Sequence, residues 1–342
     1  MSLGTGVSRE RSLRSVLDDL QAAFQEGGIP ALRKAYHQAE HMSLARRVAF
    51  RLVGTVYPVA RVLDTAVLVD DRIRELGPHL GCRAALNELG FPWEISLPPE
   101  DVSALRERPL VAYGNHPSLL TPFLVLAALD RPDVRILAVD SVTRLVPHLA
   151  PSLLSVVPTF DRRARPRLGF GFMHRVGLSL LNRMEPEVSG DAARAQNRRA
   201  LEEAASHVRD GGCIVVCPGG GAPGRWFSGI GALLKSLGDE SDRSSILLAP
   251  FQEQNCTYKL VYDILASRWP SSRKVARRRP PIRIVFSRPV PVPSILASLS
   301  PSAPELTGLL ESHYKTLFRE AARDETASGK RGKAEEDQTS DF

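Results

Sequence analysis

The feature that most constrains the fold is an alternation of short apolar segments with longer amphipathic ones, which begins near residue 100. The apolar segments are bounded by glycine, proline or polar residues, as strands are, and helix-like segments lie between them. We expect strands at 110–113, 134–139, 155–158, 213–217, 246–250, 258–264 and 282–286. We expect helices at 119–129, 192–209, 231–237 and 303–322. This alternation predicts an α/β domain in which a sheet is flanked by helices.

Composition divides the chain of 342 residues into three parts. Residues 1–95 have a mainly helical pattern, 96–322 form the α/β domain, and the polar segment 323–342 is predicted to be disordered. Four apolar residues near the N-terminus recur at every fourth position beside arginines: Leu44, Val48, Leu52 and Val56. This stripe suits a helix on a membrane surface or a helix packed on the core with a solvated arginine face. We favour the second interpretation.

The chain is basic, with 45 Lys and Arg against 38 Asp and Glu, a net charge of +7. Such an excess favours anionic partners, namely lipid headgroups, phosphorylated substrates or nucleic acid. The densest basic run, 268–279, contains Trp269, a residue type favoured at membrane interfaces. Nucleic-acid binding is not expected, because basic and aromatic residues are not interleaved and no helix-turn-helix pattern is present. No signal-peptide pattern is visible at the N-terminus.

The first candidate site is Asn115-His116, which follows the predicted strand 110–113 and precedes a predicted helix. Ligand sites of α/β sheets lie at the carboxyl ends of strands. A histidine placed there could act as a general base near neutral pH. The alternative is a loop histidine that caps the helix, and the residues alone favour neither interpretation.

Two further candidate sites follow predicted strands. The glycine-rich segment 218–224 could offer backbone N–H groups to an anion, or it could be a flexible connection. Arg162, in the segment Phe160-Asp161-Arg162, could bind a phosphate through two hydrogen bonds, or it could belong to a surface arginine cluster.

In this order, the three segments resemble the phospholipid/glycerol acyltransferase family, which is typified by lysophosphatidic acid acyltransferases. The family has N-H-x-x-x-x-D after one strand, Asp-Arg after a second, F-P-E-G after a third, and a fourth strand that ends in an apolar residue and proline. The corresponding segments here are Asn115-His116 with Thr121, Phe160-Asp161-Arg162, Cys217-Pro218-Gly219-Gly220, and Leu248-Ala249-Pro250. The resemblance covers roughly residues 95–320.

The resemblance implies an enzyme of phospholipid biosynthesis, a membrane-associated O-acyltransferase. It would move a fatty acyl group from acyl-CoA or acyl-carrier protein to a hydroxyl of a lysophospholipid or glycerolipid. His116 would be the general base, and Asn115 and Thr121 would complete the catalytic set. Eight residues would bind substrate: Ser118, Asp161, Arg162, Pro218, Gly219, Gly220, Gly221 and Arg225.

The resemblance implies no metal and no cofactor, because the acyl donor is a co-substrate. The partners would be the lipid acceptor, the acyl donor and an anionic membrane surface. The protein would therefore be cytoplasmic and peripheral on the inner face of the membrane.

Two residues depart from the family pattern. Thr121 replaces an Asp that would hold the histidine tautomer and stabilise the imidazolium. A threonine hydroxyl can accept a hydrogen bond from the ring but carries no charge, so we expect a weaker base unless Asp140 or Asp161 supplies the charge. Gly219 replaces a Glu, as in the diacylglycerol acyltransferase and phytyl ester synthase relatives, whose acceptors are neutral alcohols. The acceptor could therefore lack a phosphate, or the protein could bind lipids without catalysis.

A competing pattern is H-x-x-E-H, formed by His37, Glu40 and His41, which matches the inverted zinc peptidase motif. On a helix His37 and His41 would share one face, as two zinc ligands require. Five-residue patterns arise by chance, and this one precedes the α/β domain. We therefore favour an exposed helix face, with a zinc peptidase as the remote alternative.

Overall fold

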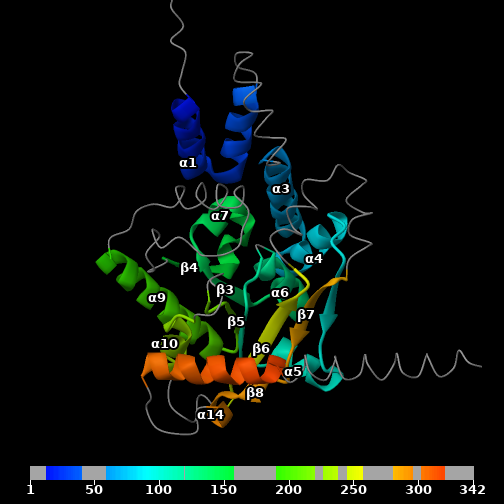
Figure 1. The fold of residues 1–342 in the computed structure, drawn as a ribbon, viewed down its shortest axis with the longest axis vertical. Helices are drawn as coiled ribbons and strands as arrows, with labels where there is room; N and C mark the ends of the chain where they lie inside the picture. Colours follow the sequence, from blue (N-terminus) through cyan, green and yellow to red (C-terminus); the bar gives the residue numbers. More distant parts are fainter. Residues whose placement is uncertain are drawn as a thin grey trace, which may run out of the picture.

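The computed structural model describes residues 13–40, 59–118, 120–157, 190–219, 226–237, 245–256, 280–295 and 302–319. These residues form an α/β protein with a mixed sheet of eight strands flanked by helices, preceded by a helical N-terminal region (Figure 1). The α/β class and the helical N-terminus predicted from the sequence are confirmed. The segments 44–56, 158–189, 258–264 and 323–342 lie outside the described residues.

The strand order follows from the pairing along the sheet. It is β1 (Trp93–Ser96), β7 (Ile282–Phe286), β6 (Leu247–Gln254), β2 (Leu110–Gly114), β5 (Cys213–Val216), β3 (Val134–Val139) and β4 (Leu153–Val156), and β8 (Val290–Pro291) also pairs with β6. The strands from β6 to β4 are parallel, whereas β7 and β8 are antiparallel to β6. The carboxyl ends of the parallel strands therefore meet at one edge, where ligand sites form in such sheets.

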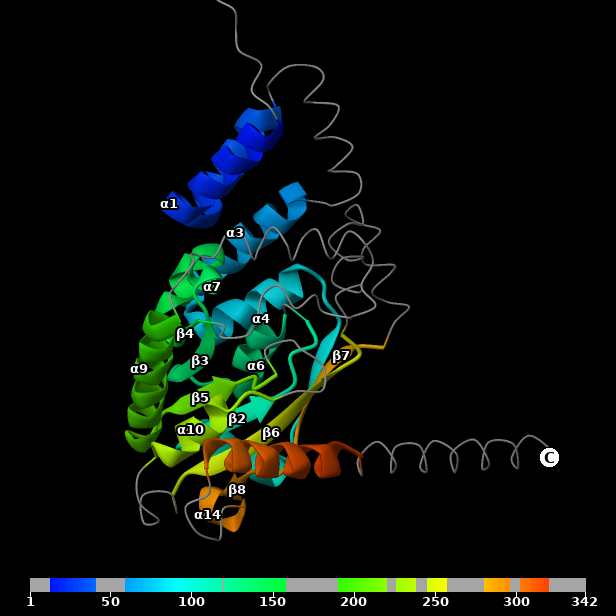
Figure 2. The same cartoon turned by 60° about the vertical axis from the view of Figure 1, so that its left-hand side comes forward.

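Helices cover both faces of the sheet (Figure 2). On one face lie α3 (Val59–Leu76), α4 (Pro78–Glu88) and α6 (Thr121–Leu129). On the other lie α9 (Gly190–Arg209), α10 (Gly229–Lys235) and a C-terminal helix formed by 303–319. The residues of the central strands alternate between the two cores, so these strands are buried on both sides and form continuous apolar runs in the sequence. Shorter helical segments are α5 (Val102–Glu107), α7 (Ser141–Leu145), α14 (Val292–Ile295), η1 (Pro99–Asp101) and η2 (Pro147–Ser152).

The N-terminal helices are tied to the α/β core. α1 (Leu13–Glu40) bends at Gly28, whose φ of 61° suits glycine, and packs on α3 through a small apolar cluster that includes Phe24 and Leu63. Helices α3 and α4 bury apolar residues such as Ile73 and Leu86 in the same apolar core as α6. In the part of the chain that the structure describes, no helix combines the length and apolarity needed to cross a membrane.

Several strands differ from the prediction. β4 begins at Leu153 rather than at residue 155, and β8 was not expected. β1 lies at residues 93–96, inside and just beyond the segment 1–95 that the sequence predicted as helical, and it completes the sheet by pairing with β7. β6 continues to Gln254, beyond the predicted end at Pro250. A proline is tolerated there because the neighbour of β6 changes at this point from β8 to β7, so the outer ladder is already interrupted.

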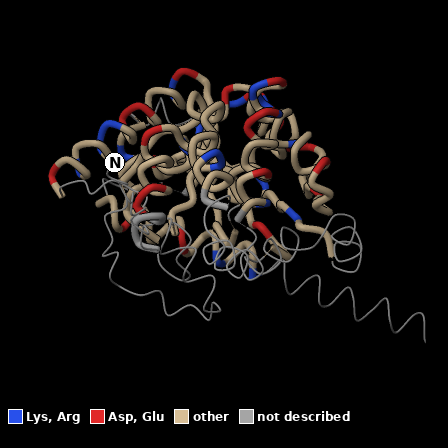
Figure 3. The backbone as a smooth tube through the Cα atoms, turned by 90° about the horizontal axis from the view of Figure 1, so that it is seen from above, with Lys and Arg blue, Asp and Glu red and all other residues tan. Residues whose placement is uncertain are grey.

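Positive and negative residues are interspersed along the described helices rather than gathered by sign (Figure 3). Arg72, for example, pairs with Glu75 at 2.6 Å and with Glu88 at 2.8 Å. The basic run 268–279 lies outside the described residues, so the expected anionic partner stays a prediction.

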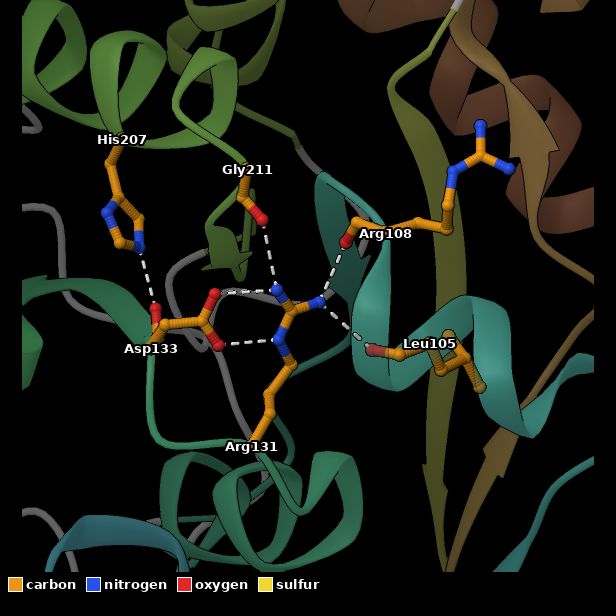
Figure 4. A network of polar contacts seen from close by, with 6 residues as sticks. All are labelled: Leu105, Arg108, Arg131, Asp133, His207 and Gly211. Atoms are coloured by element: carbon orange, nitrogen blue, oxygen red, sulfur yellow. Dashed lines mark hydrogen bonds and ion pairs between the residues drawn. The ribbon is translucent and has the colours of Figure 1, made fainter.

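The amino ends of three parallel strands are held together by the buried Arg131 (Figure 4). Its guanidinium makes two 2.6 Å contacts with Asp133. It also donates to three main-chain carbonyls, those of Leu105 (3.1 Å), Arg108 (2.8 Å) and Gly211 (3.1 Å). Because these residues precede β3, β2 and β5, one side chain fixes the start of the central sheet.

We predict that Arg131→Met lowers the free energy of unfolding by about 2–4 kcal/mol, because it leaves a carboxylate and three carbonyls, one of them fully buried, without their donor. Urea denaturation would measure the change. The matched control is Arg135→Met, which removes a 2.8 Å pair with Glu203 whose carboxylate is largely exposed. That change should cost less than about 1 kcal/mol. Equal effects of the two substitutions would contradict the role given to Arg131.

Candidate functional site

His116 lies in the loop directly after β2, at the edge where the parallel strands end. The residue is half-buried, and its Nδ1 atom is buried without a hydrogen-bond partner. Burial lowers the pKa of the imidazole to about 4. The ring is therefore neutral at pH 7, which is the form that can accept a proton.

Asn115 fixes the backbone next to His116 by pairing with the main chain of Glu253. Its Nδ2 donates to the carbonyl oxygen of Glu253 at 3.1 Å, and the amide of Glu253 donates to Oδ1 at 2.8 Å. The side-chain amide thus extends the ladder between β2 and β6 by one step. Gly114, just before it, has no room for a side chain, because a Cβ there would collide with the carbonyl oxygen of Phe251.

Ser118 and Thr121, both fully buried, hold the remainder of the loop. The Ser118 hydroxyl donates to Oε1 of Glu253 at 2.7 Å and accepts from the amide of Leu120 at 3.1 Å. The Thr121 hydroxyl donates to the carbonyl oxygen of Ser118 at 2.9 Å.

The Thr121 hydroxyl, which could have accepted a hydrogen bond from the His116 ring, instead donates to the backbone of Ser118. Thr121 is the first residue of α6 and points into the core, where its hydroxyl serves the loop backbone. Asp140, considered as a source of the missing charge, instead pairs with Arg144 at 3.3 Å and accepts from Ser155 at 3.4 Å.

Glu253 is the carboxyl group that this loop does contact, and the sequence prediction missed it. It is 3% exposed, and one oxygen, Oε2, has no hydrogen-bond partner. Burial raises the pKa of its carboxyl, and contacts with Thr121, Cys256 and Ser118 lower it in part. The sequence does contain a signal for the burial of Glu253. Every second residue of β6 from Leu247 to Phe251 lies in the same core, and residue 253 is the next position in that series.

The second candidate segment begins beside the first. Pro218 and Gly219 follow β5, the hydrogen-bonded neighbour of β2, and the Cys217 thiol lies 3.9 Å from the carbonyl oxygen of Asn115. The carbonyl oxygen of Pro218 accepts a 3.0 Å hydrogen bond from the amide of Phe227, which closes the loop. The other predicted substrate-binding residues lie outside the described residues: Asp161, Arg162, Gly220, Gly221 and Arg225.

Buried polar atoms without partners gather around Asn115. Among the described residues, six buried side-chain nitrogen or oxygen atoms have no hydrogen-bond partner, and three of these belong to His116, Glu253 and Tyr314. His116 follows Asn115 in the sequence, and Glu253 is hydrogen-bonded to the Asn115 side chain. The Tyr314 hydroxyl interacts with the backbone amide of Asn115. Because buried polar groups are nearly always paired, this concentration is what a ligand-binding site would show.

The competing zinc motif is only partly described. His37 is exposed on α1, and its ring contacts Tyr36 edge-on with 6.0 Å between ring centroids. The Glu40 side chain and His41 lie outside the described residues. Within the described ranges, no three His, Cys, Asp or Glu residues are grouped closely enough to hold a metal ion.

No protein-family model matches the chain, and no curated protein matches it either. The functional interpretation therefore depends on the residues at the carboxyl ends of β2, β5 and β6.

We predict that Glu253→Gln changes the pH dependence of stability. Because burial raises the pKa of Glu253, its contribution is present at low pH and is lost as pH rises through that pKa. The wild-type free energy of unfolding should therefore fall relative to that of the variant between pH 5 and pH 8, as measured by urea denaturation. A difference that stays constant over this range would contradict the buried, titrating carboxyl.

Proposed function

We propose that the protein is a membrane-associated O-acyltransferase of the glycerolipid type, with His116 as general base. The observation that carries the proposal is the neutral His116 ring, with an unpartnered nitrogen, at the carboxyl end of a central parallel strand. The order of motifs along the chain supports the same reaction class. The net charge of +7 supports work at an anionic lipid surface.

The proposed reaction needs one base and no cofactor. His116 takes the proton from the acceptor hydroxyl, and the hydroxyl oxygen forms a bond to the thioester carbonyl carbon. The carbon–sulfur bond then breaks, and the departing thiolate takes the proton from the imidazolium. The products are the ester and the free thiol of CoA or the carrier protein.

The residues of the predicted substrate-binding motifs favour two different acceptor classes. An acidic residue of the resembling family is absent at Gly219, which favours an alcohol without a phosphate. Arg162 and Arg225 would instead favour a phosphorylated headgroup. An assay therefore has to include both acceptor classes, with lysophosphatidic acid as one probe and diacylglycerol as the other.

We predict that His116→Ala lowers acyl transfer by about 10²–10⁴-fold, the usual contribution of a general base. The assay is release of the CoA thiol from palmitoyl-CoA with each acceptor in mixed vesicles. The matched control is His148→Ala, because His148 is an exposed histidine that pairs with Asp70 at 2.8 Å away from this loop.

Full turnover by His116→Ala would overturn the assignment of the base. Vesicle binding by the wild type without thiol release for any acceptor would favour a lipid-binding protein over an enzyme.

We also predict how kcat/KM changes at low pH. Burial lowers the pKa of His116 to about 4, so the base stays unprotonated well below the ordinary histidine range. The pH dependence of kcat/KM reports the pKa values of groups in the free enzyme. We expect kcat/KM to stay constant from pH 8 to about 5 and to fall only below that. A fall centred near pH 6.5 would show that the base is an ordinary, solvated histidine.

A further inference from the structure

The C-terminal helix places Tyr314 among aromatic rings at the edge of the candidate site. We call Tyr113, Trp226, Tyr314 and Phe318 the aromatic cluster. The ring centroid of Tyr314 lies 5.2 Å from that of Trp226, 6.4 Å from that of Tyr113 and 4.8 Å from that of Phe318. Neighbours on several sides fix the position of the ring, so its hydroxyl is held in place.

The Tyr314 ring contacts that of Tyr113, near the carboxyl end of β2. Tyr314 is 8% exposed, and its oxygen is buried without a hydrogen-bond partner. Burial raises the pKa of the hydroxyl well above its usual range, while the nearby amide of Asn115 lowers it in part and Cys217 raises it further. Asn115 directly follows β2 and precedes His116, and Cys217 directly follows β5 and precedes the glycine-rich segment.

Tyr113, in the same cluster, is a buried tyrosine whose hydroxyl has a partner within the protein. Its hydroxyl lies 3.2 Å from Nδ1 of His313 and is therefore paired. An unpaired buried hydroxyl, in contrast, costs stability, and a phenylalanine would pack equally well at position 314. A hydroxyl retained at such a cost indicates a use other than packing.

We propose that the Tyr314 hydroxyl donates a hydrogen bond to the thioester carbonyl oxygen of the acyl donor. This inference rests on the acyl transfer proposed above. When the acceptor oxygen bonds to the carbonyl carbon, the carbonyl electron pair moves to its oxygen, and Tyr314 stabilises that negative charge without giving up its proton. When the carbon–sulfur bond breaks, the pair returns and the ester carbonyl forms. One such donor typically contributes 10²–10³-fold to kcat.

The test compares Tyr314→Phe with Tyr113→Phe in the palmitoyl-CoA thiol-release assay and in urea denaturation. We expect Tyr314→Phe to lower kcat by about 10²-fold with little change in KM, because the hydrogen bond strengthens as charge develops. Its urea midpoint should equal or exceed that of the wild type. Tyr113→Phe should lower the urea midpoint, because it loses the contact with His313, and should keep the wild-type kcat.

The two proposals fail in different ways. If Tyr314→Phe retains the full turnover of the wild type, the role of Tyr314 is overturned but acyl transfer is not. A lower urea midpoint for Tyr314→Phe together with unchanged kcat would show that the hydroxyl has a structural partner and would likewise overturn that role. No thiol release by the wild type with any acceptor would overturn acyl transfer itself, and the inference with it.

Discussion

The candidate site depends on the pairing of the Asn115 side-chain amide with the main chain of Glu253. These two hydrogen bonds continue the β2–β6 ladder past the end of β2. The backbone that carries His116 is therefore fixed by the sheet rather than left as a free loop. Ser118 adds a further contact to the Glu253 carboxyl, so both sides of His116 are tied to the same strand. A rigid backbone is what a positioned base requires.

Arg131 at one edge of the parallel sheet and the loop after β2 at the other differ in how their polar groups are paired. The Arg131 guanidinium pairs with Asp133 and donates to three carbonyls, so this side chain is fully matched within the protein. At the carboxyl edge, His116, Glu253 and Tyr314 each keep a buried polar atom without a partner. Folded proteins tolerate such departures mainly where function requires them. The contrast places stability at one edge and the proposed chemistry at the other.

Local sequence patterns predicted most of the helices and strands. Contacts between segments far apart in the chain could not be predicted from the sequence. Apolar runs located β2, β5 and α6, and the loop after β2 identified His116 as a candidate. The pairing of β2 with β6 joins segments far apart in the chain, so the partner of Asn115 had no sequence signal. Tyr314 continues an apolar stripe with Leu310, which predicts its burial but not which loop its hydroxyl meets.

The most direct test of the central claim is the titration of His116 itself. The Cε1–H signal of ¹³C-labelled histidine would be followed by NMR from pH 8 to pH 4.5 and assigned by its loss in His116→Gln. Because burial lowers the pKa of His116 to about 4, we predict a signal that stays at the neutral position down to about pH 5. A midpoint near 6.5, the ordinary value for histidine, would contradict a buried neutral base at the end of β2.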